Sequence, residues 1–173
     1  MLLAPYEDLS PYPLYLQALQ DYGEEAYFST RYRKDFVSWI DIGAPDTQQQ
    51  TSAPVALDCL DDFFWSHTNQ GVRFGSNEAQ AFTYEMMEEG TQINGGIYTI
   101  FDTGASSIFL SVLWYESFIE QLYSITGIPY EVYQGTAVAG CSGFYPDIYF
   151  MIDGYWLQVQ PEDYIKETNE GNC

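Results

Sequence analysis

Short apolar stretches, separated by Gly, Asn and Pro, recur along most of the chain. Such stretches, rich in β-branched and aromatic residues and closely spaced, are typical of strands in an all-β protein. Asp153 and Gly154 stand between the last two stretches and predict a tight hairpin turn there. The stretches interpreted as strands are 26–42 (two strands joined by the charged turn 31–35), 55–60, 63–68, 72–74, 81–86, 96–101, 130–133, 148–152 and 156–159.

Two segments follow a helical period instead. Over 111–126 the apolar side chains fall on one side of a helix, and Gly127 ends the pattern. A shorter helix is predicted over 13–22, with Gly23 behind it as a cap. The sequence therefore predicts an all-β fold, mainly β with two or three short helices.

The length of 173 residues suits one domain with a sizeable core. The polar segment 44–54 is bounded by prolines, and we interpret it as a surface loop because its flanks are too short to hold separate cores. We therefore expect a single domain over 1–173. No apolar run approaches the ~20 residues of a membrane helix, and the residues after Met1 lack the pattern of a secretory signal.

The charge balance excludes several classes of function. The chain has 5 Lys and Arg against 25 Asp and Glu, a formal net charge of −20. Nucleic-acid binding needs a basic surface to displace counterions from phosphates, and attachment to anionic lipid needs one too. We therefore expect neither partner. Hydrophobic residues nevertheless make up 46% of the chain, which is the composition of a folded protein rather than a disordered one.

One motif carries candidate chemistry. The apolar run 97–101 predicts a buried strand, and Asp102 at its end is placed where a carboxylate can leave a core and enter a cleft. Thr103 and Gly104 then allow a sharp turn, because glycine has no Cβ to obstruct it. The small residues that follow strengthen the interpretation of Asp102 as a functional residue.

The cysteines do not form a zinc motif. Cys59, Cys141 and Cys173 show no C-x-x-C spacing, so we expect no thiolate metal site. Three cysteines in a monomer allow at most one disulfide and one spare thiol. Cys59 is interpreted as a small hydrophobic residue rather than a nucleophile.

Other catalytic arrangements are poorly matched. His67 is the only histidine, and the chain has no G-x-S-x-G elbow to present a nucleophilic serine, so a Ser-His-Asp hydrolase is disfavoured. We interpret His67 as a strand or turn residue. The acidic pairs 61–62 and 88–89 lack the spacing of an EF-hand loop, and we interpret them as solvated turns.

The chain resembles the pepsin-like aspartic proteases, specifically the C-terminal lobe of that two-lobed family. Segment 100–107 (I-F-D-T-G-A-S-S) is similar to the family's second D-T-G-[TAS]-S motif. Segment 141–164 (C-S-G-F-Y-P-D-I-Y-F-M-I-D-G-Y-W-L-Q-V-Q-P-E-D-Y) is similar to its C-x-x-x-x-L-P-D-I-x-F-x-I-x-G pattern. Further likenesses lie at 3–5, at 27–29 with 40–46, and at 64–75, so the resemblance covers nearly the whole chain.

The resemblance implies an aspartic-type endopeptidase that needs no cofactor and acts on peptide or protein substrates. In that family two carboxylates about 3 Å apart share one proton, so one activates a water as general base while the other protonates the scissile carbonyl. By resemblance Asp102 is the second aspartate of this pair. Thr103, Gly104, Ala105 and Ser106 hold its loop, although many C-terminal lobes carry Thr in place of Ala105.

The resemblance also implies a disulfide between Cys141 and Cys173. It would close a loop of roughly 30 residues and contribute about 3 kcal/mol in an oxidising compartment. A secretory, lysosomal or vacuolar, or extracellular location follows by the same resemblance.

The chain departs from the family pattern in containing a single D-T-G. It does not contain the N-terminal lobe with the first aspartate, nor the family's closing strands, so we expect a C-terminal lobe truncated at both ends. Such a half-enzyme needs the missing N-terminal lobe, in cis or as a second chain. The alternatives are a catalytically inactive pseudoprotease lobe that binds peptide or protein, and a retroviral-like pair of copies in which two Asp102 residues meet.

Overall fold

The computed structural model describes residues 28–31, 39–42, 53–60, 64–76, 82–83, 92–93, 96–105, 107–168 and 171–173. The chain divides into two compact units, with the main boundary between Asp58 and Cys59. Each unit is described by itself. The helix expected over 13–22 lies outside the described residues.

The first unit contains one antiparallel pair of strands. Strand β1 (Phe28–Arg31) pairs with β2 (Trp39–Ile42), with Phe28 opposite Ile42 and Arg31 opposite Trp39. Two strands were predicted within 26–42, and this prediction is confirmed.

The strand predicted over 55–60 is wrong. Residues 53–60 form no strand, and the side chain of Val55 is 50% exposed. Leu60 instead donates its N–H to the carbonyl of Ser66 at 3.0 Å. The apolar residues of this segment have strand propensity, but a strand forms only where a neighbour accepts its backbone hydrogen bonds.

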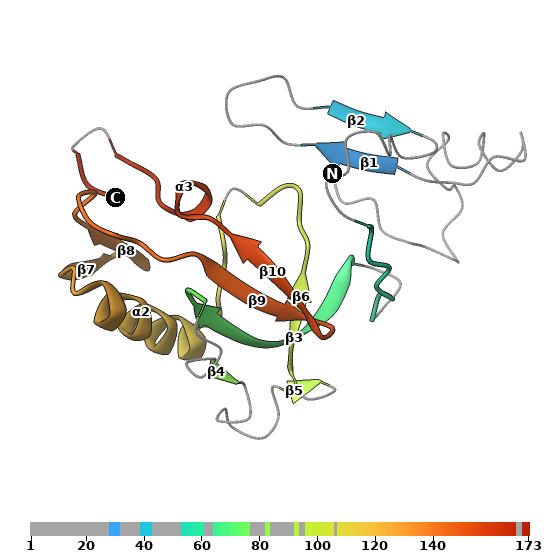
Figure 1. The fold of residues 1–173 in the computed structure, drawn as a ribbon, viewed down its shortest axis with the longest axis horizontal. Coiled ribbons are helices and arrows are strands. Elements are labelled where there is room, and N and C mark those ends of the chain that lie inside the picture. The colour runs from blue at the N-terminus through green and yellow to red at the C-terminus, as the bar shows by residue number, and fades with distance from the viewer. Residues whose placement is uncertain are drawn as a thin grey trace, which may run out of the picture. The chain divides into compact units, whose positions relative to one another are not determined.

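The second unit is built around an antiparallel sheet of six strands (Figure 1), in the order β10-β9-β3-β6-β5 with β4 also paired to β3. The strands are β3 (Ser66–Phe74), β4 (Phe82–Thr83), β5 (Gln92–Ile93), β6 (Gly96–Ile100), β9 (Ile148–Ile152) and β10 (Tyr155–Val159). The central strand β3 pairs with β6 through its first half and with β9 through its second half.

Strand β3 merges two predicted strands, 63–68 and 72–74, into one. The register against β9 shifts between Asn69 and Gly71, so the chain passes through an irregularity at Gln70 without leaving the sheet. The Asn69 side chain accepts a hydrogen bond from the Gly71 N–H at 3.2 Å and so stabilises this irregularity. The sequence predicted a break here because glycine and polar residues interrupt the apolar run.

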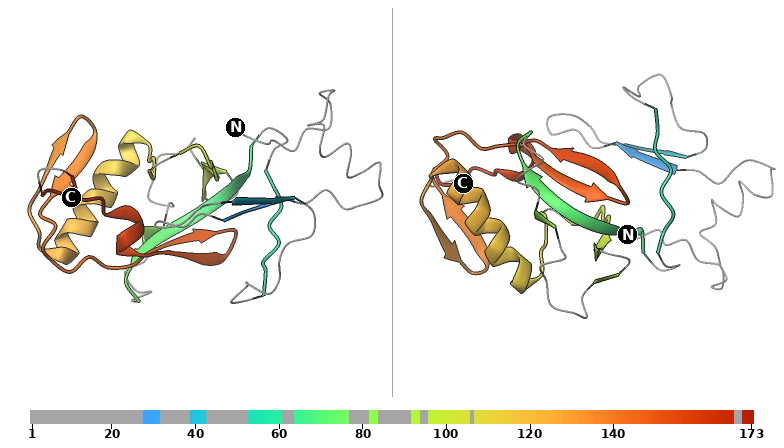
Figure 2. Two further views of the ribbon diagram at one scale, coloured as in Figure 1. Left: turned by 90° about the horizontal axis from the view of Figure 1, so that it is seen from above. Right: turned by 60° about the horizontal axis from the view of Figure 1, so that its bottom comes forward.

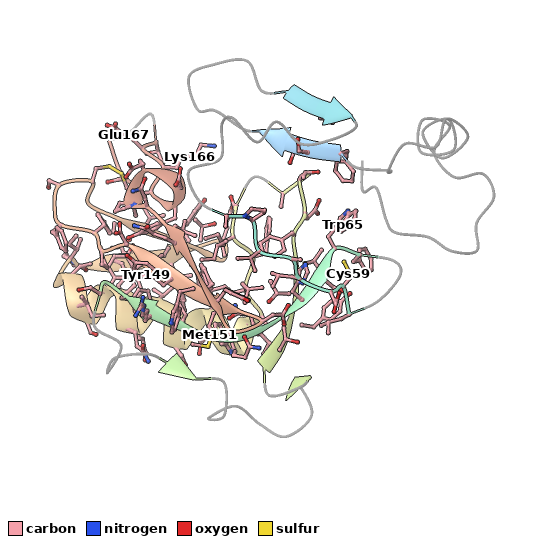
Figure 3. The ribbon with its side chains drawn as sticks, turned by 45° about the vertical axis from the view of Figure 1, so that its right-hand side comes forward. Cys59, Trp65, Tyr149, Met151, Lys166 and Glu167 are labelled. Carbon is pink, nitrogen blue, oxygen red and sulfur yellow. A yellow bond between two sulfur atoms is a disulfide. The ribbon has the colours of Figure 1, made fainter. Side chains whose placement is uncertain are left out.

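The core lies between the sheet and helix α2 (Val112–Thr126). In β9 the side chains of Ile148, Phe150 and Ile152 are buried, whereas Tyr149 and Met151 lie on the other face (Figure 3). Phe118 of α2 packs edge-on against Phe74 of β3 and parallel to Phe150 of β9, with ring centroids 5.1 and 6.3 Å apart. Buried apolar side chains of the core are Val72, Phe74, Trp114, Phe118, Ile119, Leu122, Ile148, Phe150 and Ile152.

The prediction of a helix over 111–126 is confirmed. Ser111 is the N-cap residue, and Gly127 ends the helix in the left-handed conformation with its N–H bonded to the Tyr123 carbonyl. Figure 2 shows α2 beside the hairpin of β7 (Tyr130–Tyr133) and β8 (Thr136–Ala139). The ring of Tyr123 stacks on that of Tyr130 at 4.3 Å, which joins the helix to the hairpin.

The C-terminal segment, which ends at Cys173, is bonded to β8 and to the residues directly after it. Cys141 and Cys173 form a disulfide with their Cα atoms 5.1 Å apart, as expected. Ala139 and Cys173 also exchange both backbone hydrogen bonds. A short helix α3 (Pro161–Tyr164), which the sequence pattern did not predict, precedes this segment.

The structure is therefore mostly β with antiparallel sheets and two short helices among the described residues, which confirms the predicted fold class. No helix in the described part of the chain is long and apolar enough to cross a membrane.

Candidate functional site

Asp102 lies just beyond the C-terminal end of strand β6 in the six-stranded sheet. Ile100 pairs with Ser66 of β3, and the N–H of Phe101 then donates to the carbonyl of Trp65 at 2.9 Å. The pairing ends there, and the chain turns at Asp102. The sequence predicted a buried strand over 97–101 in front of Asp102. The strand is present as Gly96–Ile100 and Phe101 separates it from Asp102, but the prediction of burial is wrong, because Gly96 is its one buried residue.

The loop at Asp102 is a tight turn with two internal hydrogen bonds. The Ala105 N–H donates to the backbone carbonyl of Asp102 at 3.1 Å, and the Gly104 N–H donates to Asp102 Oδ1 at 2.8 Å. This side-chain contact is an Asx turn, in which a short carboxylate replaces a backbone acceptor. The loop therefore fixes one carboxylate oxygen by its own backbone.

Glycine at 104 allows a close approach to this carboxylate. A Cβ placed on Gly104 would lie 3.2 Å from Asp102 Oδ1, which is tighter than an ordinary van der Waals contact. Thr103 and Ala105 are part of the same turn and are exposed. Ser106 lies outside the described residues.

The surface around Asp102 is exposed and partly apolar. The carboxylate is itself exposed, and Phe109 and Val112, which follow the loop, are each 79% exposed. Ile100, Phe101 and Ile108 are also exposed large apolar residues. We name Ile100, Phe101, Ile108, Phe109 and Val112 the apolar strip. These five side chains flank the Asp102 loop in the sequence, and large apolar side chains left exposed in such number favour a surface that another polypeptide covers.

Beneath the loop lies a side-chain pair that sequence reasoning missed. His67 of β3 is buried, and its Nδ1 lies 3.1 Å from Asp153 Oδ2 in the β9–β10 turn. The imidazole also packs edge-on against the ring of Phe101, with centroids 5.4 Å apart. His67 was correctly interpreted as a strand residue, but its partner is 86 positions away and no local pattern reveals it.

A tyrosine cluster lies between α2, the β7–β8 hairpin and the C-terminal segment. Tyr145 donates its hydroxyl to the carbonyl of Gly140 at 2.7 Å, and Tyr164 donates to the carbonyl of Pro146 at 2.6 Å. Burial, assisted by the neighbouring Tyr145, raises the pKa of Tyr123 to about 12. Burial likewise raises the pKa of Tyr145 and of Tyr164. These hydroxyls stay protonated at neutral pH, and they act as structural hydrogen-bond donors.

Polar side chains also contact one another on the face of the sheet that carries Tyr149. The guanidinium of Arg73 lies 4.5 Å from the ring centre of Tyr149 and 4.4 Å from that of Trp156, which is cation–π geometry. The Gln158 amide of β10 donates at 2.8 Å to Oδ2 of Asp147, the residue before β9. Among the described residues no group of three or more His, Cys, Asp and Glu side chains could hold a metal ion.

Comparison with protein families gives one finding. A family model described as eukaryotic aspartyl protease matches residues 18–173, which is most of the chain. A comparison with curated proteins found no match.

Proposed function

The chain belongs to the eukaryotic aspartyl protease family, and we propose that it contributes Asp102 as one of the two catalytic carboxylates of an aspartic endopeptidase. The family match supports aspartic-type peptide hydrolysis and a peptide or protein substrate. The single observation that carries the assignment of Asp102 is its place in the D-T-G turn, held by the 2.8 Å hydrogen bond from Gly104.

The proposed chemistry needs two carboxylates in close contact. When two such groups lie about 3 Å apart, repulsion prevents both from ionising, so they share one proton. One then removes a proton from a bound water while the other protonates the carbonyl oxygen of the scissile peptide. The water is the nucleophile, and no covalent intermediate with the protein forms. Asp102 would be one member, with Thr103, Gly104, Ala105 and Ser106 fixing its loop.

The second carboxylate has to come from another lobe. Among the described residues the one hydrogen bond to the Asp102 carboxylate is donated by Gly104, and the sequence contains a single D-T-G. The chain is then a half-enzyme, corresponding to a C-terminal lobe. The N-terminal lobe would be supplied in the same polypeptide or as a second chain. The exposed apolar strip beside Asp102 supports this, because a covering lobe would bury it.

A second candidate is a pseudoprotease lobe that binds a peptide or protein without cleaving it. The exposure of Asp102 favours it, since a lone solvated carboxylate has no neighbour with which to share a proton. A third arrangement, a pair of copies of this chain, would place two Asp102 residues together through the apolar strip.

The compartment follows from the family and from the disulfide. Eukaryotic aspartyl proteases are typically secreted or lysosomal, and the Cys141–Cys173 disulfide is typical of an oxidising environment. We propose a secretory, lysosomal or vacuolar, or extracellular location for this chain.

The function is tested by cleavage of a denatured protein at pH 3–5. The chain is assayed alone and mixed with an N-terminal lobe from another member of the family. We expect no cleavage alone, and pepstatin-sensitive cleavage in the mixture that Asp102→Asn abolishes and the control Asp147→Asn preserves. Cleavage by the mixture that survives Asp102→Asn contradicts the assignment of Asp102. Binding of the substrate peptide without cleavage favours the pseudoprotease.

Cleavage by the chain alone would identify the third arrangement, the pair of copies. If it rises more steeply than linearly with chain concentration and is lost in Asp102→Asn, two copies supply the two carboxylates. That result retains Asp102 as catalytic and contradicts the half-enzyme.

A further inference from the structure

Four consecutive polar residues are buried in the first half of β3, in a core that is otherwise apolar. They are Ser66, His67, Thr68 and Asn69. Burying a polar side chain costs free energy unless its hydrogen bonds are made inside the protein. This half of β3 pairs with β6, the strand that ends at Ile100, two residues before Asp102. The proposed function makes no use of these buried side chains.

His67 and the residue after it bind both oxygens of one carboxylate. His67 Nδ1 lies 3.1 Å from Asp153 Oδ2, and the Thr68 N–H donates to Asp153 Oδ1 at 3.2 Å. The Asp153 N–H donates in return to the Thr68 carbonyl at 2.9 Å. These contacts, with the hydrogen bond from the Gly154 N–H to Gln70 Oε1 at 3.2 Å, hold the β9–β10 turn against β3. Figure 1 shows this turn beside β3.

The backbone conformation at Asp153 is compatible with aspartate, whose carboxylate also makes the two contacts to β3. Asp153 has a φ of 46°, in the left-handed region, where asparagine and aspartate are tolerated but most side chains are strained. Gly154 follows it with a φ of 85°. Asparagine or glycine would suit the same turn, but neither has two charged oxygens to receive His67 and Thr68.

The other edge of His67 contacts the residue before the candidate catalytic aspartate. The imidazole lies edge-on to Phe101 at a centroid distance of 5.4 Å. Phe101 is held in turn by the hydrogen bond from its N–H to the Trp65 carbonyl, two residues before His67. His67 therefore contacts both the β9–β10 turn and the start of the Asp102 loop.

We propose that His67 is a positioning residue for Asp102. Anchored by Asp153, the imidazole fixes the ring of Phe101 and with it the point at which the chain leaves β6 and enters the turn 102–105. The proposal rests on the proposed function in taking Asp102 as the catalytic carboxylate. Among the described residues, the imidazole of His67 contacts the carboxylate of Asp153 and the ring of Phe101. The uncharged Thr99 of β6 pairs with His67 in the sheet, and Asp102 is the next residue after Phe101.

The test compares backbone amide NMR signals at pH 7 in the full chain and in its His67→Leu and His67→Asn variants. We expect the signals of Phe101 and Gly104 to move in His67→Leu and to stay close to the wild type in His67→Asn, whereas that of Gly75, bonded to the Asp147 carbonyl elsewhere in the sheet, moves in neither. An unchanged Gly104 signal in His67→Leu overturns the proposal. This readout does not need proteolysis, so a coupled loop in an inactive chain separates a failure of the proposed function from a failure of the positioning role.

Variants give a second readout. Asp153→Asn keeps a residue suited to the turn and removes the charge, and we expect hydrogen exchange at the Phe101 N–H to rise about 10-fold. Asp147→Asn is the matched control, because it makes the same change at a carboxylate bonded to Gln158. His67→Asn retains a donor close to the position of Nδ1 and should restore most of the protection that His67→Leu removes. Equal exchange at Phe101 in Asp153→Asn and Asp147→Asn overturns the proposal, and the comparison of Asp153→Asn with Asp147→Asn decides it if His67→Leu does not fold.

Discussion

The backbone N–H of Gly104 donates a 2.8 Å hydrogen bond to Oδ1 of Asp102, so the candidate catalytic carboxylate is held by the loop that carries it. The hydrogen bond sets the direction of the carboxylate before any second lobe or substrate contacts it. Positioning of this kind matters because an error of about 1 Å in a catalytic group can cost on the order of 100-fold in rate.

Gly104→Ala tests this relationship. The new Cβ would lie 3.2 Å from Asp102 Oδ1 and displace the carboxylate by a few tenths of an ångström. We expect cleavage by the assembled two-lobe enzyme to fall about 10-fold, while the free energy of unfolding changes by less than about 1 kcal/mol. The control is Gly140→Ala, where a Cβ meets no atom within 4 Å. Unchanged cleavage in Gly104→Ala would show that the carboxylate does not depend on this turn.

The contact between β3 and β6 requires glycine at another position. A Cβ on Gly96 would overlap the carbonyl oxygen of Asn69 and approach Thr68 Cγ2 at 2.6 Å. Because both neighbours lie in the central strand, relief would need a shift of the sheet. Gly96→Ala should therefore lower the free energy of unfolding by roughly 1–3 kcal/mol in urea denaturation, and Gly140→Ala again serves as control. A loss equal to that of the control would contradict the close approach.

Elements that carry a signal in their own segment were predicted accurately. Which elements pair with one another in space was not predicted. Helix α2 was predicted to within one residue, because its apolar period and Gly127 both lie in the segment itself. The Asp153–Gly154 hairpin turn was predicted for the same reason. Strand β8 was missed: it is short and its apolar residues are small, and it is recognised only by its pairing with β7.

At the candidate site, too, local features were predicted and long-range contacts were not. Asp102 was identified from the run 97–101 and the D-T-G that follows, which are local features. The His67–Asp153 contact joins residues 86 positions apart, and it exists because β9 lies beside β3. Sheet order is set by packing across the whole unit, so no local pattern encodes it. The catalytic role of Asp102 and the supporting roles of its loop residues stay predictions.

Phe118 is predicted to be a side chain of α2 on which the core depends. It contacts Phe74 and Phe150 together, and so joins the helix to two neighbouring strands. Phe118→Ala should lower the free energy of unfolding by about 3–5 kcal/mol through lost burial and the cavity left behind. Phe109→Ala removes the same ring from an exposed position and should change it by less than about 0.5 kcal/mol in the isolated chain. Comparable losses in the two variants would contradict the described core.

The disulfide is predicted to stabilise the second unit under oxidising conditions. Closing a loop with a sequence separation of 32 residues restricts the unfolded chain, and its removal should cost about 3 kcal/mol. The double change Cys141→Ala with Cys173→Ala should reproduce the effect of a reductant in thermal unfolding. Cys59→Ala leaves the disulfide in place, so this variant should retain its sensitivity to the reductant. Peptide mapping that finds Cys141 and Cys173 as free thiols would contradict the pairing.

The tyrosine cluster predicts a loss of stability in alkaline solution. Burial raises the pKa of Tyr123 from 10.0 in the unfolded chain to about 12 in the folded one, so the folded state holds this proton more tightly. Its contribution is fully present below pH 10 and is lost as the pH rises from 10 through about 12. The free energy of unfolding, measured in urea at steps from pH 8 to pH 12, should fall across this window.

Tyr123→Phe should make that fall shallower, because one buried hydroxyl no longer ionises. The same change at Tyr155, which is exposed, should leave the slope as in the wild type. Burial also raises the pKa values of Tyr145 and Tyr164, so part of the fall in the free energy of unfolding with pH remains in every variant. A Tyr123→Phe profile that coincides with that of Tyr155→Phe would show that the Tyr123 hydroxyl is not buried in solution. The cluster would then not be what holds α2 against the C-terminal segment.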